Sequence, residues 1–271
     1  MKLKKKILIM AIIGIILIII GLIIHFNRQE ESFLDGKTNH RDKFEITYSN
    51  YLERNYERYM LYKKKHNDYT DDRIITYVNI GLDKEFYSDI KETNEDDGLL
   101  IIVNKYYVIK KDYKPKTTTV GEYKAEIANE ALDDFNKMVV EAKKYQINLF
   151  PVKAYTPYAE QQALYDINVS DYGENKTLKT IAKAGHSDYQ TGLAISISGN
   201  SDNFQYTKEF AWLKEHAHEY GFILRYPKGK EDITGFEYEP YHWRYVGKDV
   251  AKIIHDKDIT FEEYYATYVL K

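Results

Sequence analysis

The chain of 271 residues contains no cysteine, and this absence excludes several kinds of structure and chemistry. No disulfide can hold the fold together, and no thiolate can serve as a nucleophile or a metal ligand. A metal site would have to use Asp, Glu or the eight His residues. The chain also lacks a large excess of charge of one sign, since its net charge is −3. We therefore expect no nucleic-acid partner.

One long apolar run stands near the N-terminus. Residues 7–24 are 18 consecutive apolar residues and glycines, and lysines occupy positions 2, 4, 5 and 6 just before them. As a helix the run would be about 27 Å long, close to the thickness of the hydrocarbon core of a bilayer. A cleaved signal peptide is the alternative, but the run is long for one and residues 25–31 offer no small-residue cleavage site. We therefore expect an uncleaved signal-anchor at the cell membrane, with the lysines in the cytoplasm and the rest of the chain outside.

Composition and periodicity divide the chain into three parts. Residues 1–26 are the cytoplasmic lysines and the transmembrane anchor, and residues 27–70 are a polar linker followed by a helical stalk over residues 48–66. Residues 71–271 form one compact domain. Its helices and strands do not alternate regularly, which predicts an α+β fold.

Hydrophobic periodicity and turn residues predict the elements of this domain. Strands are expected at residues 73–80, 99–103, 149–154, 193–197, 222–226 and 241–246. Helices are expected at residues 125–145, from residue 157 onward, and at residues 204–220, 248–255 and 260–269.

Two stretches of the sequence contain the candidate functional residues. The first reads Ala184-Gly-His-Ser-Asp-Tyr-Gln-Thr-Gly-Leu-Ala-Ile-Ser-Ile-Ser198, and the second reads Tyr238-Glu-Pro-Tyr-His-Trp-Arg-Tyr245. Together they resemble the two metal-site motifs of the VanY-type D-alanyl-D-alanine carboxypeptidases, which read about Ser-x-His-x-x-Gly-x-Ala-x-Asp and Glu-Pro-Trp-His-x-Arg-Tyr. The resemblance covers about residues 73–268. It implies a Hedgehog/DD-peptidase-like fold with a central antiparallel sheet, in which the strands at 193–197 and 241–246 lie side by side.

The resemblance also implies a zinc site, and this chain departs from it. In the family, the His and Asp of the first motif and the His of the second hold zinc, and the Glu of the second is the general base. Zinc makes its bound water acidic enough to react near neutral pH. Here Glu239 and His242 are in place, but Tyr189 stands at the zinc His position and Ser196 at the zinc Asp position. Because one good ligand remains of three, we expect no bound cofactor and no zinc catalysis.

Other roles stay open for these residues. His242 by itself could be a packed, hydrogen-bonded histidine, and Glu239 could be a carboxylate paired with a neighbour such as Arg244. Tyr189 could bind a metal only as a phenolate, which its ordinary pKa of about 10 disfavours. A shifted metal site that uses His186 or Asp188 is a further alternative.

The substrate side of the motif has changed too. Residues 154–161 resemble the family's Gly-Tyr-Arg-Ser-Tyr-x-x-Gln, whose Arg binds the substrate peptide, but the Arg position is Thr156 here. Gln161 keeps its place, either as a substrate contact or as a polar residue on an exposed helix face. Ser187 and Arg244 are the other candidate substrate-binding residues.

Three functional hypotheses follow from this pattern. The favoured one is a catalytically inactive relative that binds peptidoglycan stem peptides, or a cell-wall protein, outside the membrane. The second is an active zinc D,D- or L,D-carboxypeptidase with an altered metal site, and the third is an interaction domain whose old pocket is closed. Bound metal would distinguish the second hypothesis, and titration with a muropeptide would separate the first from the third.

Overall fold

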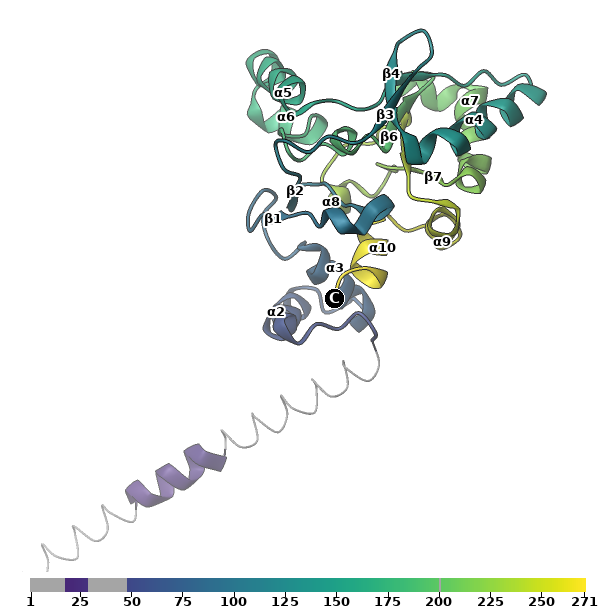
Figure 1. The fold of residues 1–271 in the computed structure, drawn as a ribbon. Coiled ribbons are helices and arrows are strands. Elements are labelled where there is room, and N and C mark those ends of the chain that lie inside the picture. Colours follow the sequence, from purple (N-terminus) through teal and green to yellow (C-terminus); the bar gives the residue numbers. More distant parts are fainter. Residues whose placement is uncertain (1–17, 29–47, 200) are drawn as a thin grey trace, which may run out of the picture.

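A small antiparallel sheet lies at the centre of the domain. The computed structural model describes residues 18–28, 48–199 and 201–271. Within these, four strands pair in the order β5-β6-β8-β7 (Figure 1), and they are β5 (Pro151–Lys153), β6 (Ala194–Ile197), β8 (His242–Tyr245) and β7 (Phe222–Leu224). The predicted α+β fold with a central antiparallel sheet is confirmed, although each strand has only three or four residues.

The register of β6 and β8 separates a core face from a polar face. Ile195 lies opposite Trp243, and Ser196 lies opposite His242. Because successive side chains of a strand point to opposite faces, the Ile195–Trp243 pair and the Ser196–His242 pair face opposite ways. Ile195 and Trp243 belong to the main hydrophobic core. The predicted side-by-side placement of these two strands is confirmed.

Two helical segments cover the core face. Phe135 and Met138 of α4 (Asn129–Lys144) and Leu213 of α7 (Lys208–His216) are buried in the same core. Helix α4 begins later than the predicted residue 125, because Ala125–Ala128 forms strand β4, which pairs with β3 (Thr117–Val120). The predicted helix at 204–220 is divided into η4 (Asp202–Tyr206), α7 and η5 (Ala217–Tyr220).

The predicted strand at 73–80 is wrong, since these residues lie in helix α3 (Asp71–Ile80). The Thr70 side chain caps the first turn by accepting from the Arg73 N–H, and Gly81 ends the helix with a φ of 111°. These caps define a helix. The β-branched residues suggested a strand because residues 74–80 are all buried, so this part of the helix lacks the exposed polar face that would reveal a helical period.

Helix α3 connects the N-terminal helices to the end of the chain. It packs against α2 (Tyr56–Lys65), which follows η1 (Glu53–Asn55), and against α10 (Phe261–Tyr268). The C-terminus lies beside these helices (Figure 1), where the Arg54 guanidinium donates to the Lys271 carbonyl at 2.8 Å.

The predicted strand at 99–103 is also absent. Its beginning lies in η2 (Glu95–Leu100), and Ile101, Ile102 and Val103 are buried without pairing to a strand. The carbonyls of Leu99 and Ile101 instead accept hydrogen bonds from the guanidinium of Arg244, at 3.0 and 2.8 Å. A side chain thus satisfies backbone groups that a neighbouring strand would otherwise have to pair.

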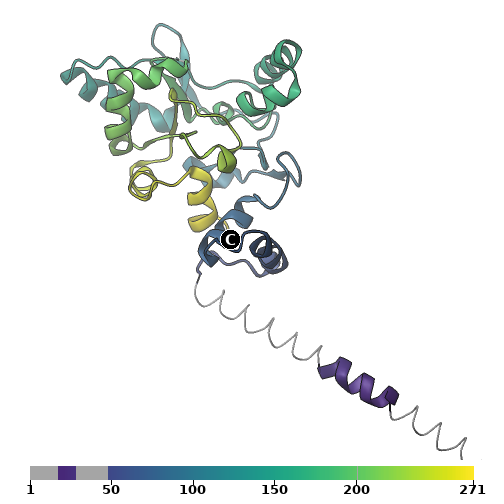
Figure 2. The same cartoon turned by 180° about the vertical axis from the view of Figure 1, so that it is seen from behind.

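The remaining elements surround the sheet, as Figures 1 and 2 show from opposite sides. They are β1 (Lys91–Glu92), β2 (Tyr107–Val108), α5 (Tyr158–Tyr172), α6 (Glu174–Thr180), η3 (Asp188–Thr191), α8 (Glu231–Thr234) and α9 (Lys248–Lys257). Strands β1 and β2 form a short parallel pair. The predicted helix after residue 157 and both predicted C-terminal helices are confirmed.

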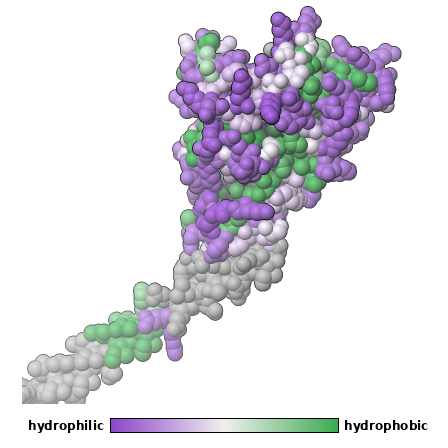
Figure 3. All heavy atoms as spheres, in the orientation of Figure 1, coloured by the Kyte–Doolittle hydropathy of each residue, from purple (hydrophilic) through white to green (hydrophobic). Residues whose placement is uncertain are grey.

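The apolar run near the N-terminus falls only partly within the described residues. Residues 18–28 are helical, and their large apolar side chains are exposed (Figure 3). Among the described residues, no helix is both long enough and apolar enough to cross a membrane. Residues 7–17 of the run lie outside the described part of the chain.

Candidate functional site

The three positions that align with the zinc ligands meet on the polar face of the sheet. The Tyr189 hydroxyl lies 2.6 Å from Oγ of Ser196, and the Tyr189 ring stacks on the His242 imidazole with centroids 4.2 Å apart. The predicted convergence of residues 189, 196 and 242 is therefore confirmed. The Tyr189 ring therefore covers the His242 imidazole, and the Tyr189 hydroxyl is hydrogen-bonded to Ser196.

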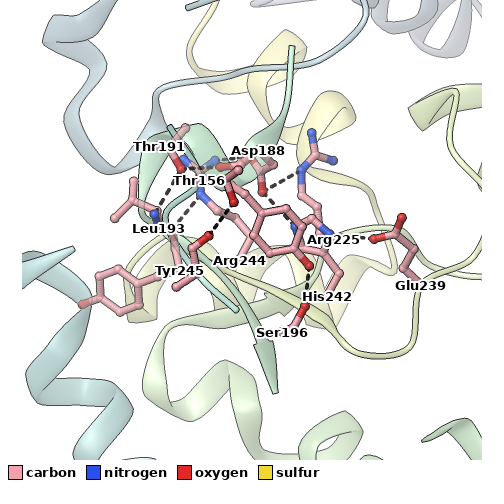
Figure 4. Close-up of polar contacts among 12 residues, drawn as sticks. Thr156, Asp188, Thr191, Leu193, Ser196, Arg225, Glu239, His242, Arg244 and Tyr245 are labelled. Carbon is pink, nitrogen blue, oxygen red and sulfur yellow. Dashed lines mark hydrogen bonds and ion pairs between the residues drawn. The ribbon is translucent and has the colours of Figure 1, made fainter. Parts of the chain in front are cut away.

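Hydrogen bonds from a side chain and from the backbone hold the turn that carries Tyr189. Thr191 Oγ1 donates to the Asp188 carbonyl at 2.7 Å and accepts from the Leu193 N–H at 3.1 Å. Gly192, with a φ of 72°, ends η3 and leads into β6. The Thr156 N–H donates to the Tyr189 carbonyl at 3.2 Å. These bonds fix η3 against β6, as the contacts of Thr156, Thr191 and Leu193 in Figure 4 illustrate.

Glu239 pairs with His242. Its Oε2 lies 2.7 Å from the His242 Nδ1, so the suggested pairing with Arg244 is wrong. Burial would lower the pKa of His242, but its contacts with Asp188 and Glu239 outweigh that effect and raise the pKa. The imidazole is thus held between two carboxylates, which favour its protonated form.

A buried group of charges lies behind the histidine (Figure 4). The carboxylate of Asp188 binds the guanidinium of Arg244, lies 3.4 Å from Nε of Arg225 and lies 3.5 Å from Nε2 of His242. Glu262 of α10 binds the other side of Arg225 at 2.6 and 2.9 Å. Burial alone would raise the pKa of Asp188, but Arg244 and Arg225 outweigh it and hold that pKa well below its ordinary value.

This group corrects the prediction for Arg244 and adds residues that the sequence analysis missed. Arg244 is fully buried, with its guanidinium bound to Asp188 and to backbone carbonyls, and it does not line the cavity. Arg225 and Glu262 were not predicted. An arginine inside the apolar stretch 222–226 was the available signal, because a buried guanidinium requires a partner.

A cavity of about 240 Å³ opens in front of the histidine. Tyr189, Ser196, Glu239 and His242 lie in its wall, together with Ser187 and Gln161. Gln161 is 2% exposed, so its alternative placement on an exposed helix face is wrong. Its Nε2 donates to the Ala182 carbonyl at 2.7 Å, while its Oε1 has no hydrogen-bond partner among the described residues.

Thr156, at the position of the family's substrate Arg, does not replace that residue. Its side chain is buried, and its Oγ1 donates to the Ala154 carbonyl at 3.3 Å. It is not part of the cavity wall. A charge for binding a ligand must therefore come from elsewhere in the cavity.

The side chains at the expected zinc position do not fit a zinc ion. Burial and the charge of Glu239 raise the pKa of Tyr189 well above its ordinary value, so the phenol keeps its proton and is a poor ligand. Ser196 is a neutral alcohol bonded to that phenol. Within residues 18–28, 48–199 and 201–271, no cluster of three His, Asp or Glu could hold a metal ion. One imidazole is fewer than the three protein ligands of a catalytic zinc site.

The structure does not favour the shifted metal site either. Nδ1 of His186 lies 2.8 Å from the Asn104 carbonyl, and His186 is not in the cavity wall. The carboxylate of Asp188 is bound to arginine.

Known proteins resemble this chain in sequence and in fold. The family model "VanY: D-alanyl-D-alanine carboxypeptidase" matches residues 124–248. YodJ of Bacillus subtilis (strain 168), which carries the name of a carboxypeptidase, is 38% identical over 205 residues, covering 68% of this chain and 75% of YodJ.

Two solved structures resemble the chain in sequence and fold. The LdcB LD-carboxypeptidase, described for its peptidoglycan recognition, superposes with a TM-score of 0.62 at 37% identity, covering 68% of this chain and 92% of LdcB. A variant of the vancomycin-resistance D,D-pentapeptidase VanY in complex with zinc superposes with a TM-score of 0.55 at 28% identity. The match covers 61% of this chain and 97% of that VanY chain. The chain belongs to the VanY family of D-alanyl-D-alanine carboxypeptidases.

Proposed function

We propose that this protein binds the stem peptides of peptidoglycan without hydrolysing them. The observation that supports the proposal is the hydrogen bond between Tyr189 and Ser196, the residues at two of the three zinc-ligand positions. The cavity beside them is still open. Without zinc, no bound water is acidified, and Glu239 has no activated water to deprotonate. A cell-wall protein is the other kind of partner that the same surface could bind.

The alternative of an active zinc carboxypeptidase is not favoured. It would need Tyr189 to ionise in a buried place that disfavours the phenolate, or a new ligand to replace it. It would also need His242 to exchange its contacts with Glu239 and Asp188 for a metal.

The binding function is tested by titrating full-length protein with a synthetic pentapeptide stem that ends in D-alanyl-D-alanine. We expect saturable binding, and we expect the peptide to be recovered intact. If no stem peptide binds, the proposal is contradicted, and an interaction domain that does not use the cavity is favoured.

We also propose that the chain is held at the cell membrane by residues 7–24, with the carboxypeptidase-like domain outside. The lysines at positions 2, 4, 5 and 6 and the 18-residue apolar run support this placement. Protease added to intact cells should remove the domain and leave a short membrane-bound stub. A domain that stays protected, or a mature N-terminus near residues 27–35, would contradict it.

A further inference from the structure

Lys153, at the end of β5, points a cation into the cavity. It lies opposite Ser196 in the pairing of β5 with β6. Residues directly opposite each other in such a pair project to the same face of the sheet, so Lys153 shares the polar face with Ser196. The side chain of Lys153 forms part of the cavity wall, together with Tyr189 and Glu239.

This cation has no charged partner of its own. In the described part of the chain, no carboxylate lies within salt-bridge distance of the Lys153 ammonium and no acceptor is hydrogen-bonded to it; Glu160 and Glu239 act on it only from a distance. Nζ lies 4.8 Å from the centroid of the Tyr189 ring. Burial lowers the pKa of Lys153, and the more distant charges of Glu160 and Glu239 offset this only in part. A partly buried ammonium in a cavity, lacking an ion-pair partner in the described residues, makes this position a candidate for binding an anion.

The same cavity also contains an unsatisfied acceptor. Among the described residues, the buried Oε1 of Gln161 has no hydrogen-bond partner, while Nε2 of that side chain donates to the Ala182 carbonyl. A buried acceptor left unpaired is unfavourable, and a ligand N–H that donates to it would remove that cost. The cavity therefore offers a positive group for an anion and an acceptor for an N–H. A peptide with a free C-terminal carboxylate carries both complementary groups.

We propose that Lys153 is the residue that recognises the C-terminal carboxylate of a peptide in this cavity. The inference rests on the proposed binding function and adds the group that determines specificity. Thr156 is neutral and lies outside the cavity wall, so it cannot supply a positive charge to a ligand. Lys153 supplies that charge from the face of the sheet that also carries Ser196 and His242.

The test compares a pentapeptide stem that has a free carboxylate with the same peptide carrying a C-terminal amide, by calorimetry on the full-length chain. The free acid should bind wild type about 10- to 100-fold more tightly, as expected for a charge-assisted hydrogen bond. Lys153→Met should remove this preference, and Lys153→Arg should keep most of it. Lys144→Met is the matched control, because Lys144 is exposed at the end of α4, and it should leave the preference unchanged.

The outcomes separate this inference from the proposed function. Equal binding of acid and amide to wild type, or a preference that survives Lys153→Met, would overturn the role of Lys153 and leave peptide binding intact. Absence of binding by either peptide would overturn both proposals. If Lys153→Met fails to fold, Lys153→Gln takes its place, because glutamine keeps a polar side chain in the cavity and removes the charge. A preference for the acid that survives Lys153→Gln would overturn the role of Lys153.

Discussion

The double variant Tyr189→His with Ser196→Asp is expected to gain zinc binding that neither single variant shows. The two substitutions would restore the imidazole and carboxylate positions of the family on either side of His242, with which residue 189 stacks and residue 196 pairs across the sheet. A full structural zinc site contributes about 10–16 kcal/mol, so each of its four ligands accounts for roughly 3 kcal/mol, or about a hundredfold in affinity.

The gain should exceed the sum of the single effects, because the ligands act together on one ion. Zinc would also have to displace Asp188 from Nε2 of His242, which should make the restored site weaker than one with free ligands. The double variant Tyr189→Phe with Ser196→Ala is the matched control, since it removes the same hydrogen bond and adds no ligand. The zinc affinity of each double variant is measured with a competing chelator. Equal affinities would show that positions 189 and 196 do not correspond to the family's ligands.

Replacing Asp188 by asparagine should destabilise the protein more than any other single change at the site. Asp188 is the carboxylate that binds Arg244, and it also faces Arg225 and His242. Removing its charge leaves a fully buried guanidinium uncompensated, which typically costs about 3–5 kcal/mol. Asp133→Asn is the control, because Asp133 is exposed and its salt bridge contributes little. Denaturant unfolding measures both.

The pH dependence of this effect gives an independent check. The pKa of Asp188 is lowered in the folded protein, so its contribution to stability is present above the unfolded pKa of about 3.9 and is lost as the pH falls through the folded value. The difference in unfolding free energy between wild type and Asp188→Asn should be largest at about pH 5, where His242 is protonated and its contact with Asp188 adds stability. It should fall as the pH rises and His242 loses its proton, and it should also shrink in stronger acid as Asp188 itself becomes protonated. A difference that is small at neutral pH would contradict the central structural role given to Asp188.

The sequence allowed the centre of the site to be predicted because the motif spacings are preserved. Tyr189, Ser196 and His242 could be placed together from their positions relative to Gly192 and the Glu239-Pro240 pair, and the β6–β8 register bears this out. The position of a residue within the motif predicts where it lies in the fold, and its side chain determines which chemistry it can perform there. For this reason the sequence also shows that Tyr189 and Ser196 stand at two of the family's zinc-ligand positions.

The supporting charges could not be predicted, because their partners are far apart along the chain. Asp188 and Arg244 are separated by 56 residues, and Arg225 and Glu262 by 37 residues. No local pattern joins them. The same reason explains the error at residues 99–103, whose carbonyls bind the distant Arg244 and not a strand. Lys153 was overlooked because its placement depends on the pairing of β5 with β6, which only the fold reveals.

The most direct test of the central claim is D-alanine release by full-length wild-type protein from a pentapeptide stem, measured with added zinc and with a chelator. We expect no release above the rate for peptide alone in either condition, because one imidazole cannot hold a zinc ion in place. The purified protein should correspondingly carry no stoichiometric zinc. Release of D-alanine that zinc supports and the chelator abolishes would contradict the account, and would mean that other residues complete a metal site with His242.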